Sequence, residues 1–471
     1  MSKPYIIGIA GESGVGKSTI AEMLCAYYGI ENVVVLSTDD LHKWCRNDKN
    51  WDNFTHLNKE ANNLELGDQH LEDLKLGKPI YRSVYSHKHG YFEAPIKIFP
   101  KDIIIVEGLH AFYTEKSKRN IDKKIYVETE ENLRVHWKII RDTSQRSGTK
   151  EKVLEAIQKR KLDAQDNREV QLPESDIIIN LSTKSPILEV GNREEIVDIC
   201  CSISKKDEEE CKLYDFIKLY TEDMNSFIDV SEMFGRDIEY VQNGGGNISV
   251  KVSEDVMIIK SSGIDMKDIR SQNGYSVVKY DNIDNIISVN NKRPSMEVKM
   301  HTFLKKYVIH LHPIYVVSIL CMKNSKKIIN SLFESKFDYG HIDFCIPGEP
   351  LTEEIQKNNN KDIFFLDNHG LIVSDNNLEK CIQKVKEISQ ICKDFVISKT
   401  NYDFILKQNL EQQKSYMFPD AIIYGTTKKE TFAVNNYINK LDKTFGSIRI
   451  LDEEVVNQIQ NLESEKYRKN L

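Results

Sequence analysis

The sequence lacks any long hydrophobic segment. No stretch approaches the roughly 20 consecutive apolar residues that a membrane-spanning helix requires. The chain also passes straight into a strand-like run at Tyr5 without the pattern of a signal peptide. We therefore expect a cytoplasmic protein that makes no membrane contact.

Paired cysteines are also missing. The nine cysteines are scattered along the chain, and only Cys200 and Cys201 are neighbours. This spacing excludes the regular cysteine pairs of a disulfide framework or of a cysteine-ligated zinc site. It is typical of reduced thiols in the cytosol.

The sequence has no long block of basic charge, no internal repeat and no low-complexity tract. Its net charge is −7, so it carries no electrostatic footprint of a nucleic-acid-binding protein, and we expect small-molecule partners. The composition, 40% hydrophobic and 29% charged, is that of a globular protein. A chain of 471 residues exceeds the ~250–300 residues at which single cores stop growing, so we expect at least two domains.

Short β-branched runs alternate with helical patterns in the first part of the chain. These runs are Tyr5–Ala10, Asn32–Ser37, Asp102–Glu107, Lys124–Val127 and Asp176–Leu181. Such alternation predicts βαβ units, and therefore an α/β domain with a mostly parallel sheet covered by helices.

A stretch rich in Lys, Asp and Glu around residues 203–212 is the best candidate for a domain boundary. Beyond it, a helical pattern over Leu213–Phe234 and later strand-like segments predict a second α/β core. We predict a first domain over residues 1–205, a linker over 206–212 and a second domain over 213–435. A C-terminal extension follows over 436–471.

Residues 11–18 read Gly-Glu-Ser-Gly-Val-Gly-Lys-Ser, between a strand-like run and a helical pattern over Lys17–Tyr28. This is a P-loop, whose backbone N–H groups and helix N-terminus cradle phosphates. Lys17 reaches the outer phosphates and Ser18 reaches Mg²⁺. The alternative, a purely structural glycine turn, does not explain the strand–loop–helix context. The predicted nucleotide-binding residues are Gly11, Ser13, Gly14, Val15, Gly16, Lys17, Ser18 and Thr19.

Four further segments accompany the P-loop: 35–44 (VLSTDDLHKW), 81–90 (YRSVYSHKHG), 103–113 (IIIVEGLHAFY) and 134–146 (RVHWKIIRDTSQR). With the P-loop they resemble the uridine kinase and phosphoribulokinase family over about residues 3–185. The resemblance implies ATP and Mg²⁺ as cofactors. It also implies a catalytic base, a magnesium ligand, two arginines on the transferring phosphoryl group and two substrate contacts. The implied base is Asp39 and the implied magnesium ligand is Glu107. The two arginines are Arg141 and Arg146, and the two substrate contacts are Tyr85 and His87.

Structural roles remain open for several of these residues. Asp39 or Asp40 could be a helix N-cap, and Arg141 could pair with a neighbouring carboxylate. His42, His87 and His110 could be structural hydrogen-bonding groups. The correspondence with the basic residues that phosphoribulokinases need for a substrate phosphate is loose. The acceptor therefore stays open between a sugar phosphate and a neutral sugar or polyol with a primary hydroxyl.

Three histidines in the second half suggest a metal centre. His310 and His312 follow each other at i and i+2 on a strand-like run, so both side chains point to the same face. His369 follows a separate strand-like run. A three-histidine site with one open position is the arrangement of catalytic rather than structural zinc.

The segments around these histidines resemble the class II aldolase/adducin family, which includes fuculose- and rhamnulose-phosphate aldolases. They are 243–249 (NGGGNIS), 261–263 (SSG) and 293–301 (RPSMEVKMH), and the resemblance covers about residues 213–400. It implies an α/β domain with a central antiparallel sheet, a homo-tetramer, and Glu297 as the catalytic acid/base. The implied sugar-phosphate-binding residues are Gly246, Asn247, Ser262, Gly263 and Ser295. Met296 departs from the family pattern, since it stands where a second serine is expected.

Other functions of this half remain open. Glu297 could form an ordinary salt bridge with Lys299 or Arg293. The domain could be a zinc-dependent epimerase, dehydratase or decarboxylase, or a metal-stabilised oligomerisation scaffold. Epimerases of this family are expected to carry aspartate at the Glu297 position, which favours aldol cleavage here.

Together the two halves predict a bifunctional enzyme with ATP, Mg²⁺ and Zn²⁺ as cofactors. The first domain would phosphorylate a ketose or related sugar. The second would cleave the product to dihydroxyacetone phosphate and an aldehyde, or run in synthesis. Phe418-Pro419-Asp420 and Glu465–Arg468 are similar to C-terminal segments of longer rhamnulose-phosphate aldolase relatives, but the sequence assigns them no role.

Overall fold

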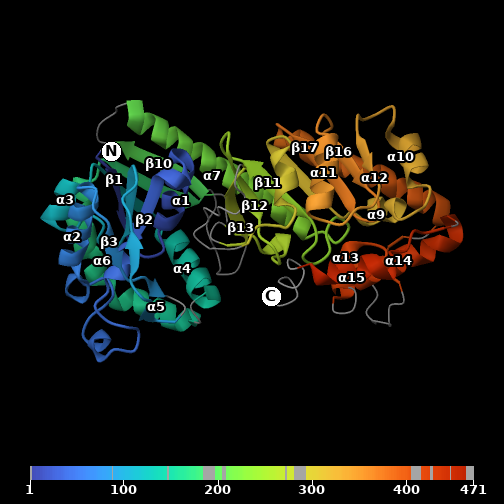
Figure 1. Cartoon of the computed structure of the whole chain (residues 1–471). Coiled ribbons are helices and arrows are strands. Elements are labelled where there is room, and N and C mark those ends of the chain that lie inside the picture. Colours follow the sequence, from blue (N-terminus) through green and yellow to red (C-terminus); the bar gives the residue numbers. More distant parts are fainter. Residues whose placement is uncertain are drawn as a thin grey trace. The chain divides into compact units, whose positions relative to one another are not determined.

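The chain forms two compact units, Met1–Glu222 and Asp223–Leu471, which are described separately (Figure 1). The structure is a computed structural model. It describes residues 3–86, 89–145, 148–183, 197–203, 208–270, 273–280, 293–401, 403–404, 415–424, 428–445 and 447–462.

The first unit is built on a six-stranded sheet with the order β10-β9-β8-β1-β7-β2. Its strands are β1 (Tyr5–Gly11), β2 (Val33–Ser37), β7 (Ile103–Gly108), β8 (Lys123–Thr129), β9 (Ile177–Thr183) and β10 (Val197–Ile203). All neighbours run parallel except β9 and β10, which are antiparallel. The predicted mostly parallel sheet is confirmed.

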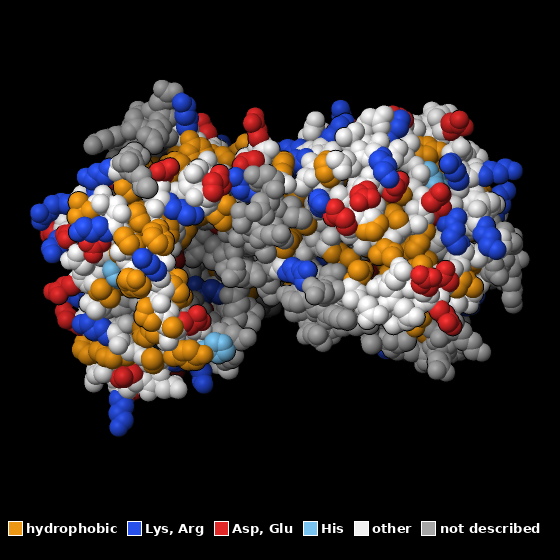
Figure 2. Space-filling model, viewed as in Figure 1, with side chains coloured by type: hydrophobic (Ala, Val, Ile, Leu, Met, Phe, Trp, Pro, Cys, Tyr) orange, Lys and Arg blue, Asp and Glu red, His pale blue; other side chains and the backbone are white. Residues whose placement is uncertain are grey.

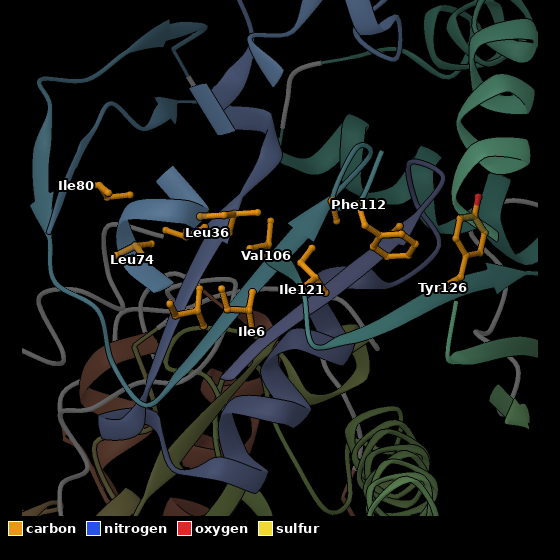
Figure 3. Close-up of a cluster of buried hydrophobic side chains, with 12 residues drawn as sticks. Ile6, Leu36, Leu74, Ile80, Val106, Phe112, Ile121 and Tyr126 are labelled. Atoms are coloured by element: carbon orange, nitrogen blue, oxygen red, sulfur yellow. The ribbon is translucent and has the colours of Figure 1, made fainter. Parts of the chain in front are cut away.

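Helices cover this sheet, and short strands lie outside it. The helices are α1 (Lys17–Tyr28), α2 (Leu64–Lys75), α3 (Glu115–Asn120), α4 (Glu131–Gln145), α5 (Lys150–Lys159) and α6 (Lys161–Gln171). The short strand pairs are β3 (Ile80–Arg82) with β6 (Ile96–Ile98), and β4 (Tyr85–Ser86) with β5 (Tyr91–Phe92). Between the sheet and α2, a core forms in which Leu36 and Val106 pack near Leu74 (Figure 3). It fixes the strands whose ends carry the first site.

Three functional segments of the first unit meet at one edge of the sheet. The P-loop follows β1, and the 3-10 helix Thr38–Leu41 follows β2. Glu107 lies near the end of β7, which pairs with both of these strands. Because parallel strands place their carboxyl ends at the same edge, ligands bind there in open α/β sheets.

Helix α7 (Glu208–Gly235) contains the division between the two units. The predicted helical pattern over 213–234 lies inside it. The charged stretch that suggested a linker overlaps the beginning of this helix. The domain limits drawn from the sequence stay a prediction.

The second unit is built on a seven-stranded sheet with the order β13-β12-β11-β14-β17-β16-β15. Its strands are β11 (Asn247–Lys251), β12 (Val256–Lys260), β13 (Tyr275–Lys279), β14 (Tyr307–Leu311), β15 (Gly340–Ile342), β16 (Ile363–Leu366) and β17 (Gly370–Asp375). All neighbours are antiparallel except β15 and β16, which are parallel. The expected antiparallel sheet is confirmed, with one parallel pair at its edge.

The helices of the second unit are α8 (Val298–Thr302), α9 (Ile314–Leu320), α10 (Ser325–Phe333), α11 (Glu349–Lys357), α12 (Leu378–Thr400), α13 (Pro419–Tyr424), α14 (Lys429–Phe445) and α15 (Glu453–Asn461). Met300 of α8 and Ile355 of α11 pack on the sheet residues Val308, Phe364 and Ile372. The three last helices lie side by side and are coloured red in Figure 1. Residues of α13 and α15 belong to a further apolar cluster, which is considered below.

Charged side chains of both signs are interspersed on the face shown in Figure 2, and neither sign forms a continuous field there. Among the helices that the structure describes, none has an apolar stretch long enough to cross a membrane.

Candidate functional site

The P-loop of the first unit has the backbone that phosphate binding requires. Gly14 and Gly16 have φ values of 93° and lie in the left-handed region that favours glycine. A Cβ on Gly11 would lie 2.4 Å from the carbonyl oxygen of Val127, so glycine alone fits there. The loop leads directly into α1, whose first residue is Lys17.

Lys17, Asp39 and Glu107 come together at this loop. The Lys17 side chain is buried, and its Nζ donates to the carbonyl oxygen of Glu12 at 2.8 Å. Burial lowers the pKa of Lys17, while Glu107 and Asp39 act in the opposite direction. Burial raises the pKa of Glu107, and Lys17 opposes that shift. The structure thus gathers one buried cation and two carboxylates beside the phosphate-binding loop.

The neighbouring carboxylates Asp39 and Asp40 have different surroundings. Asp40 Oδ2 forms a buried ion pair with Arg82 Nε at 3.2 Å, and its Oδ1 accepts from the Tyr85 backbone N–H at 2.8 Å. Asp40 therefore joins β3 and β4 to the end of β2. Asp39 lies near Lys17, whose pKa it acts to raise, and its backbone N–H donates to Ser37 Oγ.

Helix α4 presents basic side chains to Ser13 of the P-loop. Arg141 Nη2 donates to Ser13 Oγ at 3.4 Å and Arg141 Nε to Asp142 at 2.9 Å. The expected pairing with a carboxylate is thus present together with contact to the loop. Lys138 Nζ also donates to Ser13 Oγ, at 3.1 Å, and Arg134 pairs with Glu12 at 2.7 Å. The sequence reasoning missed Lys138 and Arg134, although their i, i+4 spacing puts both on one helix face.

The other residues considered for this site have structural partners or lie outside the described residues. His42 Nδ1 is 2.7 Å from Asn62 Oδ1, and His110 Nε2 is 2.9 Å from the Leu57 carbonyl oxygen. Both contacts hold the segment between the 3-10 helix and α2. His87 and Arg146 are outside the part of the chain that the structure describes.

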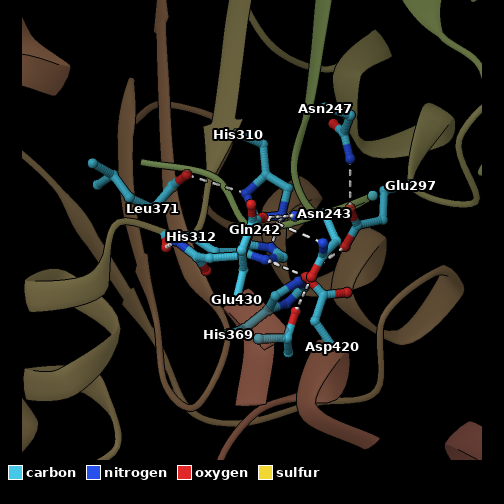
Figure 4. Close-up of polar contacts among 12 residues, drawn as sticks. Gln242, Asn243, Asn247, Glu297, His310, His312, His369, Leu371, Asp420 and Glu430 are labelled. Carbon is cyan, nitrogen blue, oxygen red and sulfur yellow. Dashed lines mark hydrogen bonds and ion pairs between the residues drawn. The ribbon is translucent and has the colours of Figure 1, made fainter. Parts of the chain in front are cut away.

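The second unit brings His310, His312 and His369 into one buried cluster (Figure 4). His310 is on β14, His312 follows that strand, and His369 precedes β17, which pairs with β14. The Nε2 atoms of His310 and His312 are 3.3 Å apart. The possible ligand atoms of all three side chains lie within 4.8 Å of one another. A single metal ion can therefore be reached by all three.

The outer ring nitrogens of two histidines have acceptors that fix their tautomers. His310 Nδ1 lies 3.1 Å from the Leu371 carbonyl oxygen, and His312 Nδ1 lies 2.7 Å from Asp420 Oδ2. Because a carbonyl and an ionised carboxylate can only accept, each Nδ1 carries the proton and each Nε2 presents a lone pair. Burial lowers the pKa of His310, and it lowers that of His369 to about 3, which favours the neutral, metal-binding form of these two imidazoles.

Glu297 faces the same point from the opposite side. Its Oε2 lies 3.5 Å from His310 Nε2, and its Oε1 lies 3.4 Å from His369 Nε2. Asn247 Nδ2 donates to Oε2 at 2.7 Å, whereas buried Oε1 has no hydrogen-bond partner among the described residues. Burial acts to raise the pKa of Glu297, whereas positive charge on the neighbouring histidines and the hydrogen bond from Asn247 act to lower it. With the imidazoles neutral, the Asn247 hydrogen bond is the contact that favours the carboxylate. A buried carboxylate oxygen without a hydrogen-bond partner among the described residues, beside the Nε2 lone pairs of His310 and His312 and the Nε2 atom of His369, fits a cation.

The salt bridge considered for Glu297 is not formed with Lys299, whose Nζ instead pairs with Glu349 at 2.5 Å. A cavity opens next to Glu297 and the histidines. It is lined by all the predicted sugar-phosphate residues, Gly246, Asn247, Ser262, Gly263 and Ser295. Met296 also lines it. The structure therefore joins the predicted phosphate loop and the predicted metal cluster in one site.

Comparison with known proteins identifies both halves. The profile described as Phosphoribulokinase / Uridine kinase family matches residues 6–187. The profile described as Class II Aldolase and Adducin N-terminal domain matches residues 226–396. The chain is a fusion of these two families. Both resemblances seen in the sequence are confirmed.

Individual relatives give the extent of the likeness. The chain is 33% identical over 181 residues to a phosphoribulokinase of Synechocystis sp., covering 38% of this chain and 54% of that protein. It is 34% identical over 159 residues to a uridine kinase of Clostridium perfringens, covering 33% of this chain and 76% of that protein. A solved N-terminal class II aldolase domain of a conserved protein from Thermoplasma acidophilum matches with 22% identity and a TM-score of 0.34, covering 37% of this chain and 93% of that one. The chain spans about half the length of the phosphoribulokinases it matches.

Two polar residues of the aldolase-type site were missed in the sequence. Lys260 ends β12, is 2% exposed and lines the cavity, with its Nζ 3.2 Å from the Gly244 carbonyl oxygen. A lysine at the end of the apolar run VMIIK, directly before Ser261-Ser262-Gly263, was the available signal. Asp420 was noticed within a motif but not connected to the histidines.

Proposed function

We propose that the chain is a bifunctional enzyme. Its kinase unit transfers phosphate from ATP to a primary hydroxyl of a ketose or related sugar. Its aldolase-type unit then performs zinc-dependent retro-aldol cleavage of that sugar phosphate to dihydroxyacetone phosphate and an aldehyde, or the reverse synthesis. The observation that carries the proposal is the convergence of three histidines and Glu297 at the edge of a cavity lined by phosphate-binding groups.

In the kinase unit, positioning and charge neutralisation do most of the work, as phosphoryl transfer requires. Lys17 and Arg141 neutralise charge on the phosphoryl oxygens, and Ser18 with Glu107 serves Mg²⁺. Asp39 orients the acceptor hydroxyl and takes its proton. The gathering of Lys17, Asp39 and Glu107 at one sheet edge supports these roles.

In the aldolase-type unit, His310, His312 and His369 would hold zinc. Zinc supplies Lewis-acid polarisation of a substrate oxygen when it is bound. Glu297 exchanges the proton at the substrate carbon next to the breaking bond, because its carboxylate lies beside the cluster and is buried from water. Asn247 holds Glu297 in this orientation.

The substrate phosphate is bound by Ser262, Gly263 and Ser295, together with Asn247. We add Lys260 to this set, because a buried ammonium group lining the cavity supplies positive charge that the serines do not. The charge of Lys260 compensates for the missing serine hydroxyl at position 296, where this chain has Met296. Localisation in the cytoplasm and assembly into a homo-tetramer are further parts of the proposal.

A screen of ketoses, polyols and nucleosides with ATP tests the proposed order of reactions. In the His310→Ala variant the second site is disabled, so we expect the phosphorylated product to accumulate and to be identifiable by mass spectrometry. Wild-type chain with the same substrate should release a triose phosphate. If the wild-type chain accumulates the phosphorylated product to the same level as the variant, the two reactions are not consecutive.

A further inference from the structure

The C-terminal part of the chain reaches the metal cluster. Asp420 lies in α13, beyond the end of the aldolase family match at residue 396. Its side chain is buried, and Oδ2 lies 2.7 Å from His312 Nδ1 (Figure 4). Pro419 and Asp420 also line the cavity beside Glu297. The motif that the sequence left without a role therefore touches the site directly.

The glycine-rich loop before β11 makes room for this contact. A Cβ on Gly245 would lie 2.3 Å from Asp420 Oδ2 and 3.0 Å from His312 Nδ1. Such distances are not possible without displacing one of the two groups. Gly245, the middle one of the three consecutive glycines at residues 244–246, thus makes room for the pair formed by Asp420 and His312, while Gly244 and Gly246 line the cavity.

The same C-terminal part also fixes the turn that carries His369. Asn368 precedes this histidine with a φ of 53°, in the left-handed region. Asn368 Nδ2 donates to the carbonyl oxygens of Met417 at 2.7 Å and of Arg449 at 2.8 Å. Arg449 Nη1 pairs with Asp367 at 2.8 Å. Two of the three histidines are therefore braced by residues that lie after the family match.

The bracing residues have a hydrophobic anchor of their own. Ile422 and Ile423 of α13 pack with Leu451 and with Ile459 of α15. Phe344, which follows β15, packs against the same cluster. Apolar contacts within the second unit thus hold α13, the helix that carries Asp420.

We propose that Asp420 is a positioning residue of the metal centre and that the C-terminal segment carrying it is an integral part of the site. The inference rests on the proposed function, since it takes the three histidines as metal ligands. The carboxylate holds the His312 proton on Nδ1, which directs the Nε2 lone pair into the cluster. Partners of this kind raise the basicity of a ligand and fix its ring, and their loss costs about 10–100-fold in metal affinity.

Metal affinity of the full-length chain tests the proposal. Zinc is titrated into metal-free protein in competition with a chromophoric chelator, for wild type, Asp420→Ala and Asp420→Asn. We expect zinc affinity to fall about 10–100-fold in Asp420→Ala. The fall should be smaller in Asp420→Asn, which keeps the volume and one acceptor oxygen but loses the charge. Asp452→Asn is the matched control, because the Asp452 carboxylate accepts from the Val455 N–H at the start of α15 and contacts no histidine among the described residues, so affinity should be unchanged.

Thermal unfolding separates positioning from folding. The metal-free Asp420→Asn chain should melt close to wild type, and only the rise in Tm on adding zinc should shrink. Wild-type zinc affinity in both Asp420 variants, with binding lost in His312→Ala, would contradict the role of Asp420 and leave the metal centre itself supported. If the wild-type chain holds no zinc, or His312→Ala binds it normally, both the metal centre and this inference are wrong.

Discussion

Asp39 and Asp40 are adjacent and chemically identical, yet they lie in different surroundings. The Asp40 carboxylate forms a buried ion pair with Arg82 and accepts from the Tyr85 N–H. These two contacts connect β3 and β4 to the end of β2. Asp39 is left beside Lys17. These contacts give Asp40 a structural role, whereas the role of Asp39 as the base stays a prediction.

Substitution of each aspartate by asparagine should affect a different property, the phosphoryl-transfer rate for Asp39 and the stability of the kinase unit for Asp40. We expect Asp39→Asn to lower the phosphoryl-transfer rate by about 10²–10⁴-fold, the usual contribution of a general base, with little change in stability. Asp40→Asn should instead destabilise the kinase unit by about 3–5 kcal/mol, because it leaves Arg82 as an uncompensated buried charge. Steady-state kinetics and urea unfolding measure the two effects. Full activity of Asp39→Asn would remove it as the base.

Glu297 offers a second test at this scale. We expect Glu297→Gln to reduce carbon–carbon cleavage by about 10²–10⁴-fold while zinc stays bound through the histidines. The control is Glu349→Gln, which changes an exposed carboxylate paired with Lys299. Cleavage is followed by triose phosphate release, and zinc by metal analysis. Cleavage at the wild-type rate in Glu297→Gln would make Glu297 structural and reopen the choice among zinc chemistries.

Residues inside local motifs were predictable, and residues that meet across the chain were not. His310 and His312 could be predicted from the sequence, because residues at i and i+2 on a strand point to the same face. Asp420 is 108 positions away from His312, and no spacing rule links them. Lys260 gave only a weak signal, since a lysine at a strand end is usually exposed.

At the scale of elements, strands and helices with strong periodicity were placed well. The run over 5–10 became β1, and α1 has the bounds expected from the P-loop. The charged stretch before residue 213 is different, because α7 already begins at Glu208. Acidic residues are favourable in the first turn of a helix, so a polar stretch does not distinguish a linker from a helix start.

The packing of α15 on α13 leads to a prediction for these elements. Ile459 is fully buried in their shared cluster, so Ile459→Ala should cost about 2–5 kcal/mol of stability in the second unit. Loosening α13 should also weaken zinc retention during dialysis against a chelator, while kinase activity is unchanged. Asn457→Ala, on the exposed face of α15, is the control. Zinc retention equal to wild type in a destabilised Ile459→Ala chain would mean that α15 does not support the site.

For the whole molecule, the two units have separate cores and separate sites. Lys17→Ala should therefore abolish phosphorylation and leave cleavage of an added sugar phosphate intact. With ATP, Mg²⁺ and the unphosphorylated substrate, wild type should yield both ADP and triose phosphate, and Lys17→Ala should yield neither. A coupled spectrophotometric assay follows both products. Equal loss of both single activities in a folded Lys17→Ala chain would contradict independent catalysis.

The brace formed by Met417, Asp420 and Arg449 also fixes the order in which the activities arise during translation. Domains fold as the chain emerges, the N-terminal one first. The P-loop, Asp39 and Glu107 are all made before the first metal-binding histidine, and the residues that hold the histidines follow last. A chain that ends between these two groups of residues contains the whole P-loop site and none of the contacts that hold the histidines. Under the proposed function, such a chain would phosphorylate its sugar and could not cleave the product.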